Sequence, residues 1–178
     1  MVRESKTASD ATLTGEGDAM TKVWDKPCVQ NLYHQEHVSC LLHSFNHWTG
    51  RTLVKAGDPI EQARWLFYAP FVVLSHNTAP DPVLNYANQE GLTLFEFSWE
   101  ELVTLPSRRT AEPSEQAQRD RLLAIVSRQG YIDDYQGVRI AKSGRRFLIE
   151  EATVWTLLDQ KGDPYGQAAT FGRWRFLD

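Results

Sequence analysis

The sequence has few cysteines and no hydrophobic run long enough to cross a membrane. Its 178 residues include two cysteines, Cys28 and Cys40, which lack CxxC spacing. Two cysteines are too few for a disulfide framework, and their scarcity is typical of a reducing compartment. A membrane span needs about 20 apolar residues, and the N-terminus lacks the hydrophobic segment of a signal peptide. We therefore expect no membrane association and a cytoplasmic location.

A strong charge of one sign is also absent. The net charge is −4 and the isoelectric point is near 5.7. Binding through phosphate contacts requires a basic patch, so we expect no direct contact with nucleic acid. With 42% hydrophobic and 24% charged residues, the composition is that of a soluble globular protein, and the length suits one domain with extensions.

Motifs of the common enzyme classes are missing. The sequence has no GxSxG turn and neither of the phosphate-binding patterns GxGxxG and GxxxxGK[ST]. Glu150 and Glu151 are adjacent on a predicted strand, so they point to opposite faces and do not form a general acid/base pair. We interpret the chain as a non-enzyme, with an uncharacterised enzyme as the least favoured alternative.

The composition changes along the chain and suggests three parts. Residues 1–22 are polar and lack periodicity, which predicts a disordered leader. Residues 23–69 show helical spacing of apolar positions and predict a helical extension. Residues 70–178 alternate between strand and helix patterns and predict the core domain.

The extension is predicted to contain two helices. The first covers residues 27–48 and ends at Gly50. The second covers residues 58–67, where Asp58 is the capping residue and Pro59 is the first helical residue. In proteins that the chain resembles, such an extension packs beside the core and takes part in dimerisation, and we expect the same here.

Four of the five histidines lie in the first predicted helix together with a cysteine. This series is His34, His37, Cys40, His43 and His47. At about 100° per residue the last four share one face, so two of them could bind a soft or borderline metal. The alternative is the polar face of an amphipathic helix. No HExxH motif or second ligand pair is present, and one straight helix cannot enclose an ion, so no metal site is predicted.

The core begins with two strands and two short helices. The strands are predicted at residues 70–76 and 83–87 and form a hairpin. Asn88 then caps one short helix, and Ser98 caps a second, with Glu101 at its third helical position.

A polar loop at residues 106–112 precedes a long helix at 114–129. Three antiparallel strands follow, at 131–140 with a break at Gly137, at 146–158 and at 165–171. The predicted fold is therefore α+β, with a five-stranded antiparallel sheet, helices on one face, and two N-terminal helices before it.

This order of elements resembles a PAS domain. The segments YANQEGL, YQGVRIAKSGRRFLIEEATVWTLL and TFGRWRF are similar to the MEKHLA domain. That PAS-related family occurs as stand-alone bacterial proteins and as the C-terminal regulatory module of plant homeodomain leucine-zipper transcription factors. The resemblance covers roughly residues 30–176 and implies a PAS-like sensory or regulatory fold. The homeodomain and zipper that give the plant members DNA binding are absent here.

A sheet covered on one face by short helices leaves a pocket suited to a small molecule. The residues that we expect to approach a ligand are His76, Asn88, Ser107, Arg108, Trp155 and Gln167. The guanidinium of Arg108 suits a carboxylate or phosphate. Each candidate also has a structural alternative, such as core packing for Trp155 and helix capping for Asn88.

The PAS resemblance also bears on cofactors and partners. Gln167 lies where flavin-binding relatives use a glutamine, so noncovalent flavin or haem binding stays open, with His76 as the haem-ligand candidate. No cysteine follows Cys40, so we expect no thiol adduct. The alternative function is a homodimeric interaction module with a filled core, which docks itself or an unknown protein partner.

Overall fold

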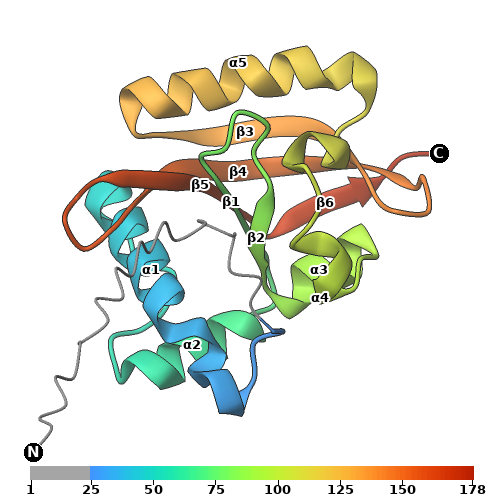
Figure 1. The fold of residues 1–178 in the computed structure, drawn as a ribbon. Coiled ribbons are helices and arrows are strands. Elements are labelled where there is room, and N and C mark those ends of the chain that lie inside the picture. Colours follow the sequence, from blue (N-terminus) through green and yellow to red (C-terminus); the bar gives the residue numbers. More distant parts are fainter. Residues whose placement is uncertain (1–24) are drawn as a thin grey trace, which may run out of the picture.

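The computed structural model describes residues 25–178, which form an antiparallel sheet with helices on both faces (Figure 1). The helices are α1 (Gln35–Thr49), α2 (Pro59–Phe67), α3 (Gln89–Phe95), α4 (Trp99–Leu102) and α5 (Pro113–Gln129), with two 3-10 segments, η1 (Val29–His34) and η2 (Ser107–Thr110). The strands are β1 (Val72–Asn77), β2 (Leu84–Ala87), β3 (Tyr131–Ile140), β4 (Arg146–Leu158), β5 (Pro164–Phe171) and β6 (Arg173–Phe176). The predicted leader at residues 1–22 lies outside the described part.

The sheet order is β2-β1-β5-β4-β3, and β6 pairs with the first half of β4. The five predicted strands are confirmed, and β6 is a sixth that the prediction missed. It has four residues, and three of them are exposed, so it lacks the buried alternation that marks a longer strand. None of the described helices is long and apolar enough to cross a membrane.

The first helix starts later than predicted. We expected it to begin at residue 27, but α1 begins at Gln35 because the φ angles of Leu32, Tyr33 and His34 are 52°, 52° and 59°. This left-handed backbone turns the chain so that Tyr33 is buried beside Phe67 of α2. Tertiary packing thus overrides a helical spacing that the sequence alone supports.

Adjacent residues of β4 point to opposite faces of the sheet and show how the helices are distributed. Val154 packs against Leu122 and Val126 of α5. Trp155 packs against Phe45 of α1, with ring centroids 5.0 Å apart. We call these the α5 face and the α1 face.

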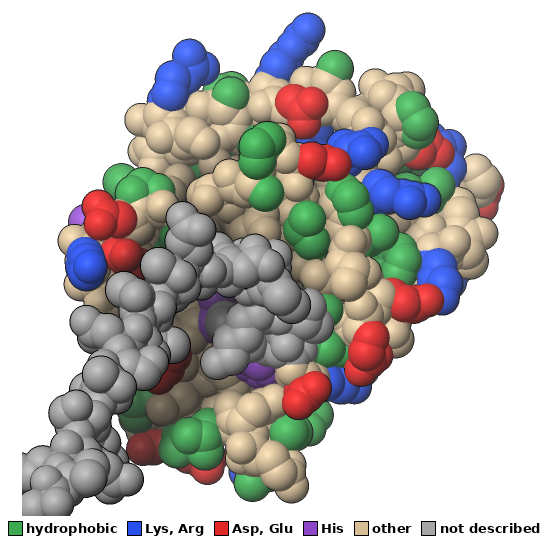
Figure 2. All heavy atoms as spheres, viewed as in Figure 1, with side chains coloured by type: hydrophobic (Ala, Val, Ile, Leu, Met, Phe, Trp, Pro, Cys, Tyr) green, Lys and Arg blue, Asp and Glu red, His purple; other side chains and the backbone are tan. Residues whose placement is uncertain are grey.

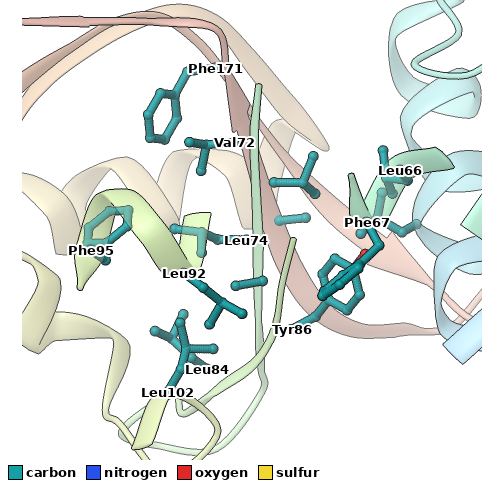
Figure 3. Packing of buried hydrophobic residues seen from close by; sticks show 14 of the residues in the cluster. Leu66, Phe67, Val72, Leu74, Leu84, Tyr86, Leu92, Phe95, Leu102 and Phe171 are labelled. Carbon is teal, nitrogen blue, oxygen red and sulfur yellow. The ribbon is translucent and has the colours of Figure 1, made fainter. Parts of the chain in front are cut away.

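The core helices share one face of the sheet, as predicted, and the two N-terminal helices cover the other face. Figure 3 shows Leu74 of β1 with Leu92 and Phe95 of α3 on one side of the strand, and Tyr86 with Phe67 of α2 on the other. The prediction holds for α3 and α5, whereas α1 and α2 cover the opposite face (Figure 1). The physical reason is that β4 is apolar on both faces, as in strands covered on both sides, and each face requires a cover.

Candidate functional site

A small cavity lies between the α5 face of the sheet and the segments that cover it. Its volume is about 70 Å³, and apolar residues such as Leu74, Phe95 and Ala169 form part of its wall. Its polar lining comes from β1, η2, α5, β3 and β5. The principal polar residues are His76, Ser107, Arg119, Tyr135, Arg139 and Gln167.

His76 and Gln167 are direct neighbours across the β1–β5 ladder, so both side chains point to the α5 face. The Nδ1 atom of His76 lies 2.8 Å from the carbonyl oxygen of Asn77. Because a carbonyl can only accept, Nδ1 carries the proton and Nε2 is a bare acceptor. Burial, with a smaller contribution from the charge of Arg119, lowers the pKa of His76 to about 4, so the ring is neutral at pH 7.

Gln167 connects the cavity to α5. Its Nε2 atom donates to the carbonyl oxygen of Leu123 at 3.0 Å and to Oγ of Ser127 at 2.9 Å. Its Oε1 atom, like Nε2 of His76, is buried and has no hydrogen-bond partner among residues 25–178. Two buried acceptors on adjacent strands are thus left without donors at this cavity.

Arg119 enters the cavity from α5 and is 5% exposed. It donates to Oγ of Ser107, and Nη1 donates to Oδ1 of Asp120 at 3.2 Å. The side chain of Asp120 is 69% exposed, so this carboxylate compensates the buried charge from the solvent side. Burial lowers the pKa of Arg119, and the nearby charge of Arg139 lowers it further.

Arg139 is a second buried guanidinium, on β3, and it is 9% exposed. It donates to the carbonyl oxygen of Val138 at 2.8 Å and to the hydroxyl of Tyr135 at 3.2 Å. Among the described residues it forms no ion pair, and no Asp or Glu lines the cavity. The site is therefore positively charged.

Gly137 leaves room for the contact between Tyr135 and Arg139, which lie on either side of it on the same face of β3. A Cβ at this position would lie 2.3 Å from the Tyr135 hydroxyl and 3.0 Å from Nη1 of Arg139. We expected the strand to be interrupted or bulged at Gly137; β3 runs unbroken from Tyr131 to Ile140, and its register with β4 shifts between Tyr135 and Gly137. The consequence of this shift is to hold a buried arginine against the cavity.

Three of the six predicted site residues line the cavity: His76, Ser107 and Gln167. The other three do not. Asn88 is fully buried, and its Oδ1 accepts from the backbone N–H groups of Val73 at 3.0 Å and Gly91 at 3.1 Å. Its Nδ2 donates to the carbonyl oxygen of Phe71 at 2.6 Å. Asn88 therefore caps α3 and joins it to β1.

Arg108 and Trp155 also lie away from the cavity. Arg108 is on the surface, and its Nε forms an ion pair with both carboxylate oxygens of Asp81, at 3.0 and 3.1 Å. Trp155 is fully buried on the α1 face, where it packs against Phe45. Trp155 lies away from this cavity because the strand period places every second residue of β4 on the opposite face.

The sequence prediction missed Arg119, Arg139 and Tyr135. Arg119 lies three residues before Leu122 and seven before Val126, so it belongs to the buried stripe of α5. The sequence does place a charged residue at a position that faces the core. We missed it because arginine is usually exposed.

The histidines of the first predicted helix do not converge. The ring of His34 lies 2.6 Å from the carbonyl oxygen of Asp25, ahead of α1. His37 is buried, where its Nε2 lies 3.0 Å from Oγ of Ser75, and burial lowers its pKa to about 4. The rings of His43 and His47 stack at 6.4 Å. No group of three or more metal-ligating residues occurs in the described part of the chain.

Neither flavin nor haem fits the cavity. Sites for ligands of drug or cofactor size occupy about 300–1,000 Å³, several times the volume found here. Cys40 lies on α1, which covers the other face of the sheet. The cavity is suited to a guest much smaller than these cofactors.

The sequence matches the model of the MEKHLA domain over residues 35–176. Two homeobox-leucine zipper proteins of Arabidopsis thaliana, ATHB-9 and ATHB-14, are 27% and 28% identical to the chain over 146 and 137 residues. The aligned regions cover 79% and 76% of this chain. They cover 17% and 16% of the two relatives, so the chain spans about a sixth of their length.

Solved structures share the fold. A PAS domain from Colwellia psychrerythraea has a TM-score of 0.55 at 15% identity and covers 66% of this chain and 94% of its own. An RNA-binding light-oxygen-voltage receptor has a TM-score of 0.52 at 18% identity and covers 67% of this chain and 33% of its own. These similarities confirm the PAS-like topology of the sheet and its helices.

Proposed function

The chain belongs to the MEKHLA domain family, and from this premise we propose that it is a PAS-like sensory module that binds a small molecule. The binding site is the cavity on the α5 face. One observation carries the proposal: the buried atoms Nε2 of His76 and Oε1 of Gln167 both lack donors at this cavity among residues 25–178.

An unpaired buried polar group destabilises a protein by about 1–3 kcal/mol, and native structures contain few of them. Two such groups on paired strands, beside two buried guanidiniums, indicate a site arranged for a guest. A ligand with a hydrogen-bond donor would satisfy one or both of the acceptors on His76 and Gln167. The destabilisation that comes from unpaired buried acceptors would then be greatest in the ligand-free protein.

Gln167 provides the route by which binding reaches the rest of the molecule. Its amide joins the cavity to the Leu123 carbonyl and the Ser127 hydroxyl on α5. A ligand that engages this amide changes its two bonds to the helix, so α5 is the element that responds. The response is passed on through protein contacts, without catalysis and without direct contact with nucleic acid. On the face that Figure 2 shows, charges of both signs are interspersed.

A cavity-filling variant tests this function. The melting temperature of the full chain is measured against a library of metabolites for the wild type and for Ala169→Leu, which places a larger side chain at the cavity wall. We expect a compound that raises the melting temperature of the wild type and leaves that of Ala169→Leu unchanged. Arg108→Ala, on the surface, is the control that keeps the response. A response equal in all three proteins would place the ligand elsewhere, and no response in the wild type would contradict ligand binding.

The second candidate is a homodimeric interaction module, which a group of exposed apolar side chains favours. Val29, Leu32, Trp65 and Tyr68, on and beside η1 and α2, are 66%, 43%, 48% and 59% exposed. Trp65 and Tyr68 also line a groove of about 810 Å³ between α2 and residues 52–57. Light scattering on the wild type and on Trp65→Ser/Tyr68→Ser tests it. A wild-type dimer that the double variant dissociates supports this candidate, and a monomeric wild type contradicts it.

A further inference from the structure

The chemistry of the cavity identifies the class of its ligand. Resting on the function proposed above, we propose that the ligand is a small oxyanion that also carries an O–H donor. A 2-hydroxy acid of two or three carbons is the type compound, and bicarbonate shares the same chemistry.

The donors are the guanidiniums of Arg119 and Arg139, which are 5% and 9% exposed. Arginine has five N–H groups and no acceptor, and it is the side chain best shaped to bind carboxylates. Arg119 donates hydrogen bonds to Ser107 and Asp120. Arg139 donates hydrogen bonds to Val138 and Tyr135. Each guanidinium therefore has N–H donors to spare.

The charges around the cavity favour an anion. Burial lowers the pKa of Arg119, and the charge of Arg139 adds to this effect, so the two guanidiniums lie near each other. The acids whose charges act on Arg119 are Asp120 and Asp81, whose side chains are 69% and 48% exposed, and Asp81 is already paired with Arg108. A small anion bound between the two arginines would supply the buried countercharge that the described chain lacks there.

The acceptors require that the anion also donate. Nε2 of His76 is a bare acceptor because the Asn77 carbonyl holds the proton on Nδ1, and Oε1 of Gln167 is an acceptor because Nε2 is used by α5. A simple carboxylate has only acceptors, so it would leave both atoms unsatisfied. A hydroxyl group beside the carboxylate would donate to one of them and also accept from a guanidinium.

The size of the cavity limits the ligand further. The cavity volume of about 70 Å³ is several times smaller than the roughly 300–1,000 Å³ of a site for a drug-sized ligand. Only molecules of a few non-hydrogen atoms fit this space. Long-chain acids, nucleotides and sugars are excluded by volume, whereas glycolate and bicarbonate have the required size and groups.

Isothermal titration of the full chain with four matched probes tests the inference. Glycolate carries both charge and hydroxyl, acetate lacks the hydroxyl, glycolamide lacks the charge, and bicarbonate represents the inorganic source. We expect glycolate or bicarbonate to bind on the order of tenfold more tightly than acetate, and glycolamide to bind most weakly. Equal binding of glycolate and acetate, or of glycolate and glycolamide, would overturn the proposal, as would no binding of any probe.

Two variants assign the binding to these residues. Arg139→Met retains the apolar bulk of the side chain and removes its charge, so we expect glycolate binding to weaken at least about tenfold. Gln167→Leu removes one acceptor, so the preference for glycolate over acetate should shrink. Arg108→Met removes a surface charge and is the matched control. Circular dichroism establishes that each variant is folded, and should Arg139→Met be unfolded, the Gln167→Leu result and the four wild-type titrations decide the matter.

The two proposals fail in different ways. If the metabolite library yields a neutral ligand whose effect Ala169→Leu abolishes, the sensory function stands and the oxyanion inference is wrong. If neither the library nor the four probes changes the melting temperature, both are wrong.

Discussion

The two faces of the sheet are built from the same strands but differ in the polar groups that they bury. On the α1 face, Trp48 donates to the Thr156 carbonyl at 2.9 Å, and Ser44 accepts from the N–H of Leu158 at 2.8 Å. Within the described part of the chain, the Tyr86 hydroxyl and the Trp155 indole N–H on this face also lack hydrogen-bond partners, but neither residue lines the cavity. On the α5 face, two arginines and two unpaired acceptors surround a cavity.

The difference separates stability from binding. The α1 face is packed with aromatic rings and supplies stability, because apolar burial is the main favourable term in folding. On the α5 face the charges of Arg119 and Arg139 are buried, which is energetically unfavourable and typical of functional sites. Substitutions on the α1 face should therefore mainly lower the free energy of unfolding, whereas substitutions on the α5 face should mainly weaken ligand binding.

Trp155→Ala should have the largest effect on stability. Removing a fully buried indole from the α1 face leaves a void beside Phe45, so we expect the free energy of unfolding to fall by about 3–5 kcal/mol. Urea denaturation measures the change, with Arg108→Ala as a surface control. A loss below about 1 kcal/mol would mean that the α1 face is not the stabilising one.

Acidification should destabilise the protein through one histidine on each face. His37 and His76 both have a pKa lowered to about 4 by burial, against 6.5 when unfolded. The unfolded chain binds a proton that the folded chain resists, so this stability is complete above pH 6.5 and is lost as the pH falls towards 4. Between pH 7 and pH 5 each histidine should contribute about 2 kcal/mol of the loss.

Urea denaturation of the wild type, His37→Gln and His76→Gln at pH 7 and pH 5 measures these shares. In each variant, the free energy of unfolding should fall less between pH 7 and pH 5 than it does in the wild type. A pH dependence that neither substitution reduces would show that other groups control it.

Gly137→Ala should have an intermediate effect. The added Cβ would clash with the Tyr135 hydroxyl and crowd Arg139, so we expect a loss of about 1–3 kcal/mol and weaker ligand binding together. Denaturation and titration on the same sample measure both. Gly144→Ala is the matched control for strain alone, since its φ is 89° and no atom lies within 4 Å of a Cβ there. It should lose stability without losing binding.

Arg139→Met should have the smallest effect on stability. Replacing a buried, unpaired charge by an apolar side chain of similar length is expected to change the free energy of unfolding by at most about 1 kcal/mol, or to increase it. Thermal and urea denaturation measure it. A loss of several kcal/mol would show that the arginine supports the fold and is not reserved for a ligand.

The sequence was sufficient for most of the fold. Period-two alternation located five strands, and the caps at Asn88 and Ser98 were found because their side chains have local backbone partners. The start of α1 and the short strand β6 were missed because both depend on contacts distant in sequence, Tyr33 with Phe67 and Phe147 with Phe176.

The site was harder to predict than the fold. His76 and Gln167 were identified as strand residues near a pocket, but their pairing required the β1–β5 register, which no local pattern specifies. Arg119 and Arg139 were missed because arginine is usually exposed, and only the assembled sheet and helix show that both are buried.

The most direct test of the account follows one side-chain signal from each face by nuclear magnetic resonance. The Gln167 side-chain amide reports on the cavity, and the Trp155 indole N–H reports on the α1 face. During titration of the full chain with glycolate, we expect the Gln167 signals to shift and saturate while the Trp155 signal stays in place. Unchanged Gln167 signals, or a shift confined to Trp155, would contradict the assignment of binding to the α5 face.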